Sequence, residues 1–335
     1  MANILLTEKC VRSCPYCFAK KHMDLSDDST FLSWEDLIYI IDLFDIQGTK
    51  HISFLGGEPT LHPEYVDFVL YSAARNFHST TFTSGIMSVK KLEEAVKTFK
   101  KIPSESFNFV CNLNHPDLSS KEETEKIEKF LTEFGQQTTL SFNIFDIDFT
   151  MEYLFDYIER FNLQRHIRMG LAHPIHGQKN KIIPRSEFKR LADKLISYVP
   201  MFIEHDVAAG FDCGFPMCIF NDEQLGKLIR IERGGDRRAI RFVCDPALDI
   251  GPDMKVWSCF PLSGFHKRSI YEFDSVNEIL EYYKGLHLKI RQKKAGIFDE
   301  CEFCSFREKG QCAGGCLAHV LNDLDEAEEN QEIET

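Results

Sequence analysis

Short apolar runs alternate with longer amphipathic stretches along the first 200 residues of the chain. The apolar runs predict six β-strands, at Ile4–Thr7, His51–Leu55, Thr80–Thr83, Phe107–Asn112, Thr138–Phe145 and His166–Leu171. The amphipathic stretches predict five helices between these strands, at Trp34–Phe44, Pro63–Asn76, Val89–Lys100, Lys121–Phe134 and Met151–Phe161. Candidate N-caps precede the first and the last of these helices, at Ser33 and Thr150.

This alternation of strand and helix implies parallel strands joined by right-handed crossovers. Six such units are enough for a partial (β/α)6 barrel, so the predicted fold class is α/β. In such barrels the chemistry lies at the carboxyl ends of the strands. From about Ala208 the alternation stops and glycine and cysteine become more frequent, which predicts a small Cys-rich cluster-binding domain after the barrel.

Three cysteines, Cys10, Cys14 and Cys17, follow the first predicted strand at C-x3-C-x2-C spacing. Three thiolates in one loop can ligate three irons of a [4Fe–4S] cluster and leave the fourth iron open to a chelating small molecule. Zinc is the competing interpretation, although a zinc site usually takes four ligands from paired knuckles. Disulfides are not expected, because residues 1–9 lack the pattern of an export signal. The loop therefore predicts a reaction centre.

Two further polar loops follow predicted strands and should meet the cysteine loop on the same rim. Gly56-Gly57-Glu58-Pro59 follows the second strand, and Thr83-Ser84-Gly85 ends the third. Glycines alone are typical of a plain turn, but a carboxylate beside two exposed backbone groups suits an ammonium group. Thr83 and Ser84 are equally consistent with capping of the next helix. His173 and His176, after the sixth strand, are more typical of structural histidines.

Eight more cysteines follow residue 208, and the last four have C-x2-C-x7-C-x3-C spacing; the eight are Cys213, Cys218, Cys244, Cys259, Cys301, Cys304, Cys312 and Cys316. Eight thiolates are the number that two fully ligated [4Fe–4S] clusters need. Two zinc sites would need the same number, so the count does not decide between them. An amphipathic helix is predicted between the two groups, at Asp274–Lys293. Cys111 stands alone in a predicted strand and is interpreted as a core cysteine.

The composition of the 335 residues narrows the class of protein. A net charge of −13 disfavours a general nucleic-acid binder. No apolar run approaches the ~18 residues of a membrane span, so no membrane association is expected. Reduced cysteines that bind metal fit a cytoplasmic location. From Asp323 to Thr335 there are seven acidic and no basic residues, which predicts a frayed tail.

Cys10-x3-Cys14-x2-Cys17 with Tyr16 before the third cysteine, followed by Gly56–Pro59, resembles the radical S-adenosylmethionine (radical SAM) superfamily. The later cysteines resemble the SPASM/twitch extension of that superfamily. The resemblance implies a radical SAM partial barrel over residues 1–205, an auxiliary iron–sulfur domain over 206–322 and an acidic tail over 323–335 that we expect to be disordered.

The resemblance also implies roles for individual residues. The three cysteines of the first loop would ligate the cluster, and its open iron would bind the amino and carboxylate groups of S-adenosylmethionine. Reductive cleavage would then release a 5′-deoxyadenosyl radical that takes a hydrogen atom from a substrate. The residues expected to contact S-adenosylmethionine are Gly56, Gly57 and Glu58 at its ammonium, Tyr16 near its adenine, and Ser84, Asn112 and Asn143 at its ribose or carboxylate.

The SPASM pattern assigns the later cysteines to auxiliary clusters. The first auxiliary cluster would use Cys244, Cys259 and Cys316, with Met254 where the motif has glycine. The second would use Cys301, Cys304 and Cys312. The pattern closes that second cluster with a downstream cysteine, and none follows Cys316. Cys213 or Cys218 could supply the missing ligand, so the hypothesis is two auxiliary [4Fe–4S] clusters, with one complete cluster as the alternative.

The substrate is most consistent with a peptide or protein side chain, as in the peptide-modifying maturases of the subgroup. The sulfatase-maturing members have an aspartate base where this chain has Phe260, which removes support for that activity. Only nine residues precede Cys10, so a peptide substrate would need a separate recognition protein or direct capture. A flavodoxin or ferredoxin would be the reductant. The alternatives are a small-molecule radical dehydrogenase, an iron–sulfur electron-transfer protein and a zinc-stabilised regulatory module.

Overall fold

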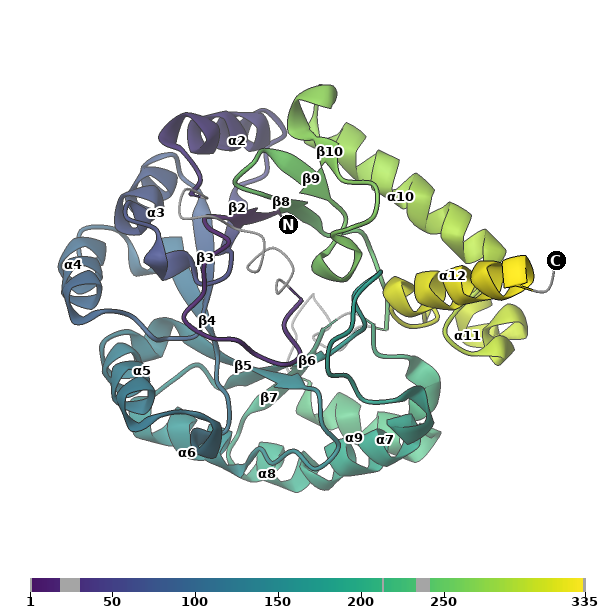
Figure 1. Ribbon diagram of the computed structural model, residues 1–335. Helices are drawn as coiled ribbons and strands as arrows, with labels where there is room; N and C mark the ends of the chain where they lie inside the picture. The colour runs from purple at the N-terminus through teal and green to yellow at the C-terminus, as the bar shows by residue number, and fades with distance from the viewer. Residues whose placement is uncertain (1, 19–30, 213, 233–241, 334–335) are drawn as a thin grey trace.

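The computed structural model describes residues 2–18, 31–212, 214–232 and 242–333 of the chain. Its centre is a curved sheet of ten strands with helices along the outer face (Figure 1). The strand order is β10-β9-β8-β1-β2-β3-β4-β5-β6-β7, and β1 to β7 are parallel to one another. The predicted α/β class with a partial barrel of parallel strands is therefore confirmed.

The six predicted strands are all present, as β1 (Ala2–Leu5), β2 (His51–Leu55), β3 (His78–Thr83), β4 (Phe107–Asn112), β5 (Thr138–Ile144) and β6 (His166–Leu171). A seventh strand, β7 (Ala208–Phe211), pairs with β6 in parallel. The barrel thus has one more parallel strand than predicted, and this strand lies beyond the predicted barrel boundary at residue 205. Its sequence, Ala-Ala-Gly-Phe, lacks the β-branched residues that mark strands.

Eight helices of the described residues accompany β1 to β7, namely α2 (Trp34–Ile46), α3 (Tyr65–Ala74), α4 (Val89–Phe99), α5 (Lys121–Phe134), α6 (Glu152–Phe161), α7 (Phe188–Ser197), α8 (Val199–Glu204) and α9 (Asp222–Ile231). Ser33 caps α2 as predicted, because its side chain accepts from the Asp36 N–H. The prediction of Thr150 as a cap is wrong, since Met151 is the N-cap of α6 and makes no side-chain cap bond. In the described chain, no helix has both the length and the apolar character needed to cross a membrane.

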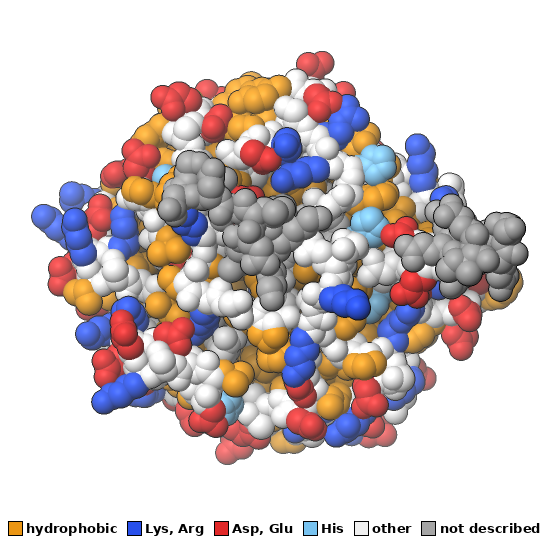
Figure 2. All heavy atoms as spheres, in the orientation of Figure 1, with side chains coloured by type: hydrophobic (Ala, Val, Ile, Leu, Met, Phe, Trp, Pro, Cys, Tyr) orange, Lys and Arg blue, Asp and Glu red, His pale blue; other side chains and the backbone are white. Residues whose placement is uncertain are grey.

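The core lies between the sheet and these helices. Large side chains from the strands, such as Phe54 and Phe109, and from the helices, such as Phe68 and Phe130, are no more than 1% exposed. Burying a side chain of this size contributes roughly 1.5–3 kcal/mol. The solvent side of the helices carries charged residues of both signs, which are interspersed over the face seen in Figure 2. The packing of the helices on the sheet therefore fixes the positions of the carboxyl ends of the strands and of the loops that follow them.

The C-terminal part of the chain extends the same sheet. Strand β8 (Leu248–Ile250) pairs in parallel with β1, β9 (Lys255–Trp257) pairs antiparallel with β8, and β10 (Arg268–Ser269) pairs antiparallel with β9. The helices of this part are α10 (Val276–Lys293), α11 (Ser305–Glu308) and α12 (Leu317–Ile333). A side chain of β8 also contacts β1, since Asn3 Nδ2 donates to Asp249 Oδ1 at 2.6 Å. The Cys-rich part is thus joined to the barrel through main-chain pairing.

The acidic tail is helical over most of its length. Helix α12 continues to Ile333, so the prediction of disorder from residue 323 is wrong up to that residue. Asp323 accepts two hydrogen bonds from Arg185, at 2.6 and 2.8 Å, and a third from Lys294 at 2.6 Å. Asp325 Oδ2 lies 2.8 Å from His176 Nε2. These contacts to the barrel give the start of the tail a fixed place that charge composition alone did not predict.

Candidate active site

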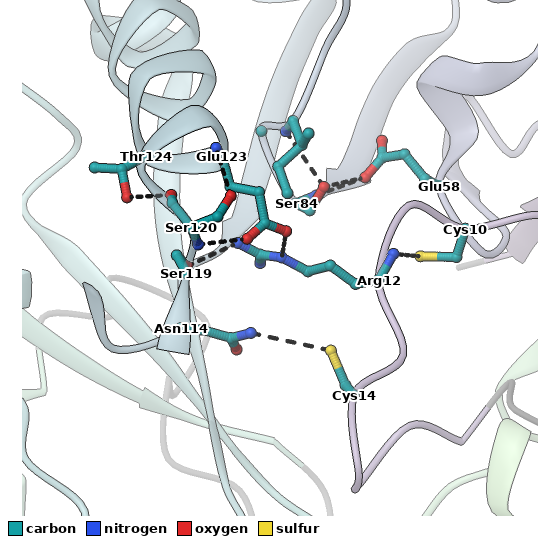
Figure 3. A network of polar contacts seen from close by, with 12 residues as sticks. Cys10, Arg12, Cys14, Glu58, Ser84, Asn114, Ser119, Ser120, Glu123 and Thr124 are labelled. Atoms are coloured by element: carbon teal, nitrogen blue, oxygen red, sulfur yellow. Dashed lines mark hydrogen bonds and ion pairs between the residues drawn. The ribbon is translucent and has the colours of Figure 1, made fainter. Parts of the chain in front are cut away.

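The three-cysteine loop leaves the carboxyl end of β1, and Figure 3 shows Cys10 and Cys14 in it. All three cysteines are half-buried thiols that are not joined in disulfides. N–H groups face their sulfurs: the Arg12 amide lies 3.5 Å from Cys10 Sγ, and Asn114 Nδ2 lies 4.0 Å from Cys14 Sγ. The Cys17 amide donates to the Cys14 carbonyl at 3.1 Å, which closes a turn between them. The loop therefore presents three thiols, and N–H groups lie beside the sulfurs of Cys10 and Cys14.

The electrostatics of these thiols fit a cationic group between them. Burial raises the pKa of Cys10 to about 12, and the nearby charges of Glu58, Cys17 and Cys14 add to the shift. Three thiolates this close need positive charge to be stable together, and iron supplies it as ligation displaces the protons. In the described part of the chain, no group of three or more His, Cys, Asp or Glu side chains is arranged to hold one ion. A cubane cluster does not require that arrangement, because each thiolate binds a different iron.

The two glycines after β2 lie directly against the cysteine loop. The Gly57 amide donates to the Thr7 carbonyl at 2.9 Å, and the Glu58 amide donates to the Lys9 carbonyl at 2.7 Å. A Cβ on Gly57 would stand 2.1 Å from the Lys9 carbonyl oxygen and 2.8 Å from the Cys10 nitrogen. A Cβ on Gly56, where φ is +149°, would stand 2.2 Å from the Thr7 carbonyl oxygen. Only glycine allows this approach of the two loops.

Glu58 joins the ends of β2 and β3. Its carboxylate is only 1% exposed and accepts from Thr60 Oγ1 at 2.8 Å and from Thr83 Oγ1 at 2.7 Å. The Ser84 backbone N–H and hydroxyl donate to the other oxygen at 2.8 and 2.6 Å (Figure 3). The contact of Gly56, Gly57 and Glu58 with an ammonium group stays a prediction. The structure adds that Glu58 fixes the position of Ser84, another predicted contact residue.

The other predicted contact residues form one polar chain at the ends of β4 and β5. Asn143 Nδ2 donates to Asn112 Oδ1 at 3.0 Å, and Asn112 Nδ2 donates to the Tyr16 hydroxyl at 3.3 Å. The Tyr16 hydroxyl donates in turn to Asn114 Oδ1 at 2.9 Å. The Tyr16 ring stacks on Phe145 with centroids 4.6 Å apart, and burial raises the pKa of its phenol. The fold thus brings Tyr16, Asn112 and Asn143 together beside the cysteine loop.

Arg12, between the first two cysteines, was not singled out by the sequence analysis. Its side chain is only 8% exposed and crosses to the β4–α5 side of the barrel. The guanidinium donates to the Asn112 carbonyl and to Ser119 Oγ, both at 3.4 Å, and lies 3.7 Å from Glu123 (Figure 3). A single arginine between cysteines carries no pattern, so only the fold identifies it as an anchor of the loop.

The segment after β6 packs on the other side of the cysteine loop. The Lys181 amide donates to the Pro15 carbonyl at 2.9 Å. Asn180 Nδ2 donates to the carbonyls of Tyr16 at 3.4 Å and His173 at 2.9 Å. His173 is only 5% exposed, and its ring stands edge-on to that of His319 at 5.8 Å. Segments that follow β1, β2, β3, β4 and β6 therefore meet around one loop.

The later cysteines separate into two neighbourhoods. Cys218, Cys301, Cys304 and Cys312 line one small cavity. Cys244 accepts a hydrogen bond from the backbone of Leu317, which directly follows Cys316, and burial raises the pKa of Cys244. Cys259 precedes a short helical turn, Phe260–Leu262, that packs against α12. Cys213 lies outside the described residues.

A hollow of about 1000 Å³ lies at the opposite rim of the barrel. It is lined by residues at the amino ends of the strands, including His51, His78, Phe107 and Thr139. Barrel enzymes of this class place their chemistry at the carboxyl ends. The cysteine loop lies at the carboxyl ends, so the active site is expected there and not in the hollow at the amino ends.

Comparison with known families gives a match over residues 4–132 to the model described as the Radical SAM superfamily. Among curated proteins, the chain is 37% identical over 84 residues to the S-adenosylmethionine-dependent nucleotide dehydratase of Selenomonas ruminantium. That alignment covers 25% of this chain and 29% of the relative. The chain thus spans less than a third of that relative's length.

Solved structures match over more of the chain. Native anSMEcpe with bound AdoMet and Cp18Cys peptide has a TM-score of 0.64 at 15% identity, covering 94% of this chain and 88% of that one. Streptococcus suis SuiB bound to the precursor peptide SuiA has a TM-score of 0.58 at 15% identity, covering 82% of this chain and 62% of that one. At these identities the likeness is one of fold.

Proposed function

We propose that this chain, which belongs to the radical SAM superfamily, cleaves S-adenosylmethionine reductively and modifies a peptide or protein side chain through a radical. The observation that carries the proposal is the docking of the cysteine loop against Gly56, Gly57 and Glu58 at the carboxyl rim. Two backbone hydrogen bonds and two close glycine contacts hold the three-cysteine loop beside the polar groups of Glu58 and Ser84. A protein that only stored or relayed electrons would have no need of this second loop.

Each role in this proposal falls to a residue that the fold positions. Cys10, Cys14 and Cys17 would hold a [4Fe–4S] cluster with an open iron. When bound, that cluster would supply the electron with which the S–C5′ bond of S-adenosylmethionine breaks, giving methionine and a 5′-deoxyadenosyl radical. The backbone at Gly56–Glu58 and the side chain of Ser84 would orient the methionine end, and Tyr16, Asn112 and Asn143 the nucleoside end. The segment around Asn180 contacts the loop at Tyr16 and Pro15, and it would limit the access of water to the site.

A peptide substrate is favoured by the extent of the fold likeness. The anSMEcpe and SuiB structures, each with a peptide bound, share the fold over 94% and 82% of this chain, so the likeness includes the Cys-rich part. A nucleotide or other small molecule is the second candidate. It is favoured by the 37% identity to a nucleotide dehydratase, which covers 25% of the chain.

The proposal includes partners and a location. A flavodoxin or ferredoxin would deliver the electron, since no redox group other than the clusters is expected. A separate recognition protein could present a peptide. The cytoplasm would keep the cysteines reduced and ready for iron.

The test of the chemistry is formation of 5′-deoxyadenosine. After anaerobic reconstitution with iron and sulfide, protein reduced with dithionite should convert S-adenosylmethionine to 5′-deoxyadenosine and methionine, measured by liquid chromatography. Cys14→Ala should lower the rate by about 100-fold or more, because it removes one of the three ligands. Cys111→Ala is the matched control, since Cys111 is fully buried in β4 outside the loop. Equal rates for the two variants would contradict the proposal, as would an inactive wild-type protein that carries its full iron content.

The substrate class is tested with the same assay. A peptide fraction of a cell extract should stimulate 5′-deoxyadenosine formation and yield a peptide of altered mass. Stimulation by CTP, GTP, UTP or ATP with no effect of peptides would instead favour the nucleotide candidate.

A further inference from the structure

Four cysteines from two distant parts of the chain line one small cavity. Cys301, Cys304 and Cys312 belong to the Cys-rich C-terminal part, whereas Cys218 stands more than 80 positions earlier in the sequence. Cys218 lies in a short helical turn, Met217–Ile219, which follows β7, the strand at one edge of the sheet. The barrel itself therefore delivers a fourth thiol to the three-cysteine group.

Short turns of the backbone direct the three later cysteines to the same cavity. Cys301 lies in the short helical turn Asp299–Phe303, and Cys304 caps α11 with its carbonyl accepting from the Arg307 and Glu308 amides at 3.1 Å. The Cys312 amide donates to the Phe306 carbonyl at 3.2 Å, which returns the chain to the same cavity. A Cβ on Gly296 would stand 2.5 Å from Cys301 Sγ, so a glycine at this position leaves room for the sulfur.

Positive and hydrogen-bonding groups lie beside these cysteines. Arg307 lines the cavity and donates to the Cys301 carbonyl at 2.8 Å, and Lys189 donates to the Cys218 carbonyl at 2.5 Å. The Gly314 amide faces Cys312 Sγ at 3.4 Å. Cations and N–H donors near the ligands would stabilise the anionic centre that four thiolates form with a metal group.

We infer that Cys218, Cys301, Cys304 and Cys312 form the complete ligand set of an auxiliary [4Fe–4S] cluster, with the barrel supplying the fourth ligand. Four cysteines satisfy all four irons, so this centre has no open position. The assignment rests on the proposed function only for the identity of the metal group; the grouping of the four ligands does not depend on it. It also explains how the cluster could be complete although no cysteine follows Cys316.

Of the two candidates for the missing ligand, Cys213 and Cys218, the inference selects Cys218. It leaves Cys244, Cys259 and Cys316 as the group of a second centre, consistent with the contact of Cys244 to the start of α12. It further implies that metal binding links the β7 end of the barrel to the segment before α12. Loss of one ligand should therefore weaken this link, while the secondary structure of the rest of the chain is retained.

The test starts from a variant without the first site, Cys10→Ala/Cys14→Ala/Cys17→Ala, reconstituted anaerobically. Adding Cys218→Ala should lower bound iron by about four per chain, or by about one with a three-iron signal in the oxidised electron paramagnetic resonance (EPR) spectrum. Adding Cys304→Ala should give the same result. Adding Cys111→Ala is the control and should leave the iron content and the EPR spectrum unchanged. Adding Cys218→Ser should retain iron but shift the spectrum of the reduced centre, because an oxygen replaces a sulfur ligand.

The outcomes are distinguishable from misfolding and from failure of the proposed function. Circular dichroism and size-exclusion chromatography should show the same fold for the Cys218→Ala and Cys111→Ala proteins. Unchanged iron and an unchanged spectrum after Cys218→Ala, with a loss after Cys304→Ala, would overturn the ligand assignment. About one zinc per chain that is lost with Cys218→Ala would overturn the cluster identity. If wild-type protein fails to cleave S-adenosylmethionine while these iron losses are observed, the proposed function fails and the ligand set stands.

Discussion

The substitution Gly57→Ala tests whether the cysteine loop is held in place by the glycine loop beside it. The added Cβ would stand 2.1 Å from the Lys9 carbonyl oxygen and 2.4 Å from the Lys9 carbonyl carbon. Ordinary contact begins near 3.4 Å, so the backbone at Lys9 must retreat by about 1.3 Å, the difference between 3.4 and 2.1 Å. Because these are backbone atoms, no side-chain rotation can relieve the contact.

The expected cost follows from what this shift disrupts. The Glu58 amide donates to the same Lys9 carbonyl at 2.7 Å, and an added 1.3 Å would break that bond. A lost backbone hydrogen bond costs about 1 kcal/mol, and forcing one carbon into a packed contact costs about 1–3 kcal/mol. The total of about 2–4 kcal/mol corresponds to a roughly 30- to 1000-fold lower population of the docked loop.

Two measurements follow the effect, and a second glycine is the control. After anaerobic reconstitution, Gly57→Ala should form 5′-deoxyadenosine at least about 30-fold more slowly and hold less iron than the wild type. Gly226→Ala lies in the middle of α9 with no atom within 4 Å of the added Cβ. It should leave both measurements unchanged and raise the free energy of unfolding by up to ~1 kcal/mol.

A specific result would refute this reasoning. If Gly57→Ala keeps both the iron content and the rate of the wild type, the loop is not positioned by this contact. If Gly226→Ala lowers the iron content and the rate as much as Gly57→Ala does, the chain is sensitive to any change of glycine. The docking of the loop would then have no support.

Three further predictions concern carboxylates, of which two are buried and one is partly exposed. Glu58→Gln should lower the free energy of unfolding by about 1–3 kcal/mol in guanidinium titrations, because an amide cannot accept all the bonds from Thr60, Thr83 and Ser84; an unchanged midpoint would contradict this. Burial raises the pKa of Asp249 to about 7, so its contribution is fully present below about pH 4 and is lost as pH rises through 7. Asp249→Asn should remove a fall of roughly 4 kcal/mol over that range, seen in denaturation at several pH values. Although burial opposes it, hydrogen bonds from Arg185 and Lys294 hold the pKa of Asp323 below its usual value. Its contribution is thus present at neutral pH and lost as pH falls below about 4, and Asp323→Asn should flatten that acid limb.

The parts of the fold that the sequence predicted well are those with a local cause. Strands such as His51–Leu55 and helices such as Lys121–Phe134 have clear periodicity and capping residues, and their bounds agree with the structure. The meeting of the Cys10 loop with Gly56–Glu58 followed from a topological rule, because parallel strands bring their carboxyl ends to one rim.

The features that the sequence analysis missed depend on contacts between distant residues. Strand β8 is three residues long and pairs with β1 across more than 240 positions, so no local pattern marks it. Arg12 acts through Asn112 and Glu123, about 100 positions away. The tail was predicted to be disordered from its charge, but Asp323 is matched by Arg185 and Lys294 from elsewhere in the chain. Charge composition predicts solvation only where no partner is available.

These distant contacts share one consequence for the architecture. The C-terminal part reaches both edges of the open sheet, through the pairing of β8 with β1 and through the cavity that Cys218 shares with Cys301, Cys304 and Cys312 near β7 (Figure 1). Arg185, just before α7, adds a third link, since it donates to the Ile297 carbonyl at 2.7 Å and to Asp323. The sheet from β1 to β7 is open, since β1 pairs with β8 and β7 is an edge strand, and the Cys-rich part contacts the chain on both sides of this opening. A cluster held by Cys218 would join the Cys-rich part to the barrel through metal bonds, so iron loading at the auxiliary site should also stabilise the rim on which the first cysteine loop lies.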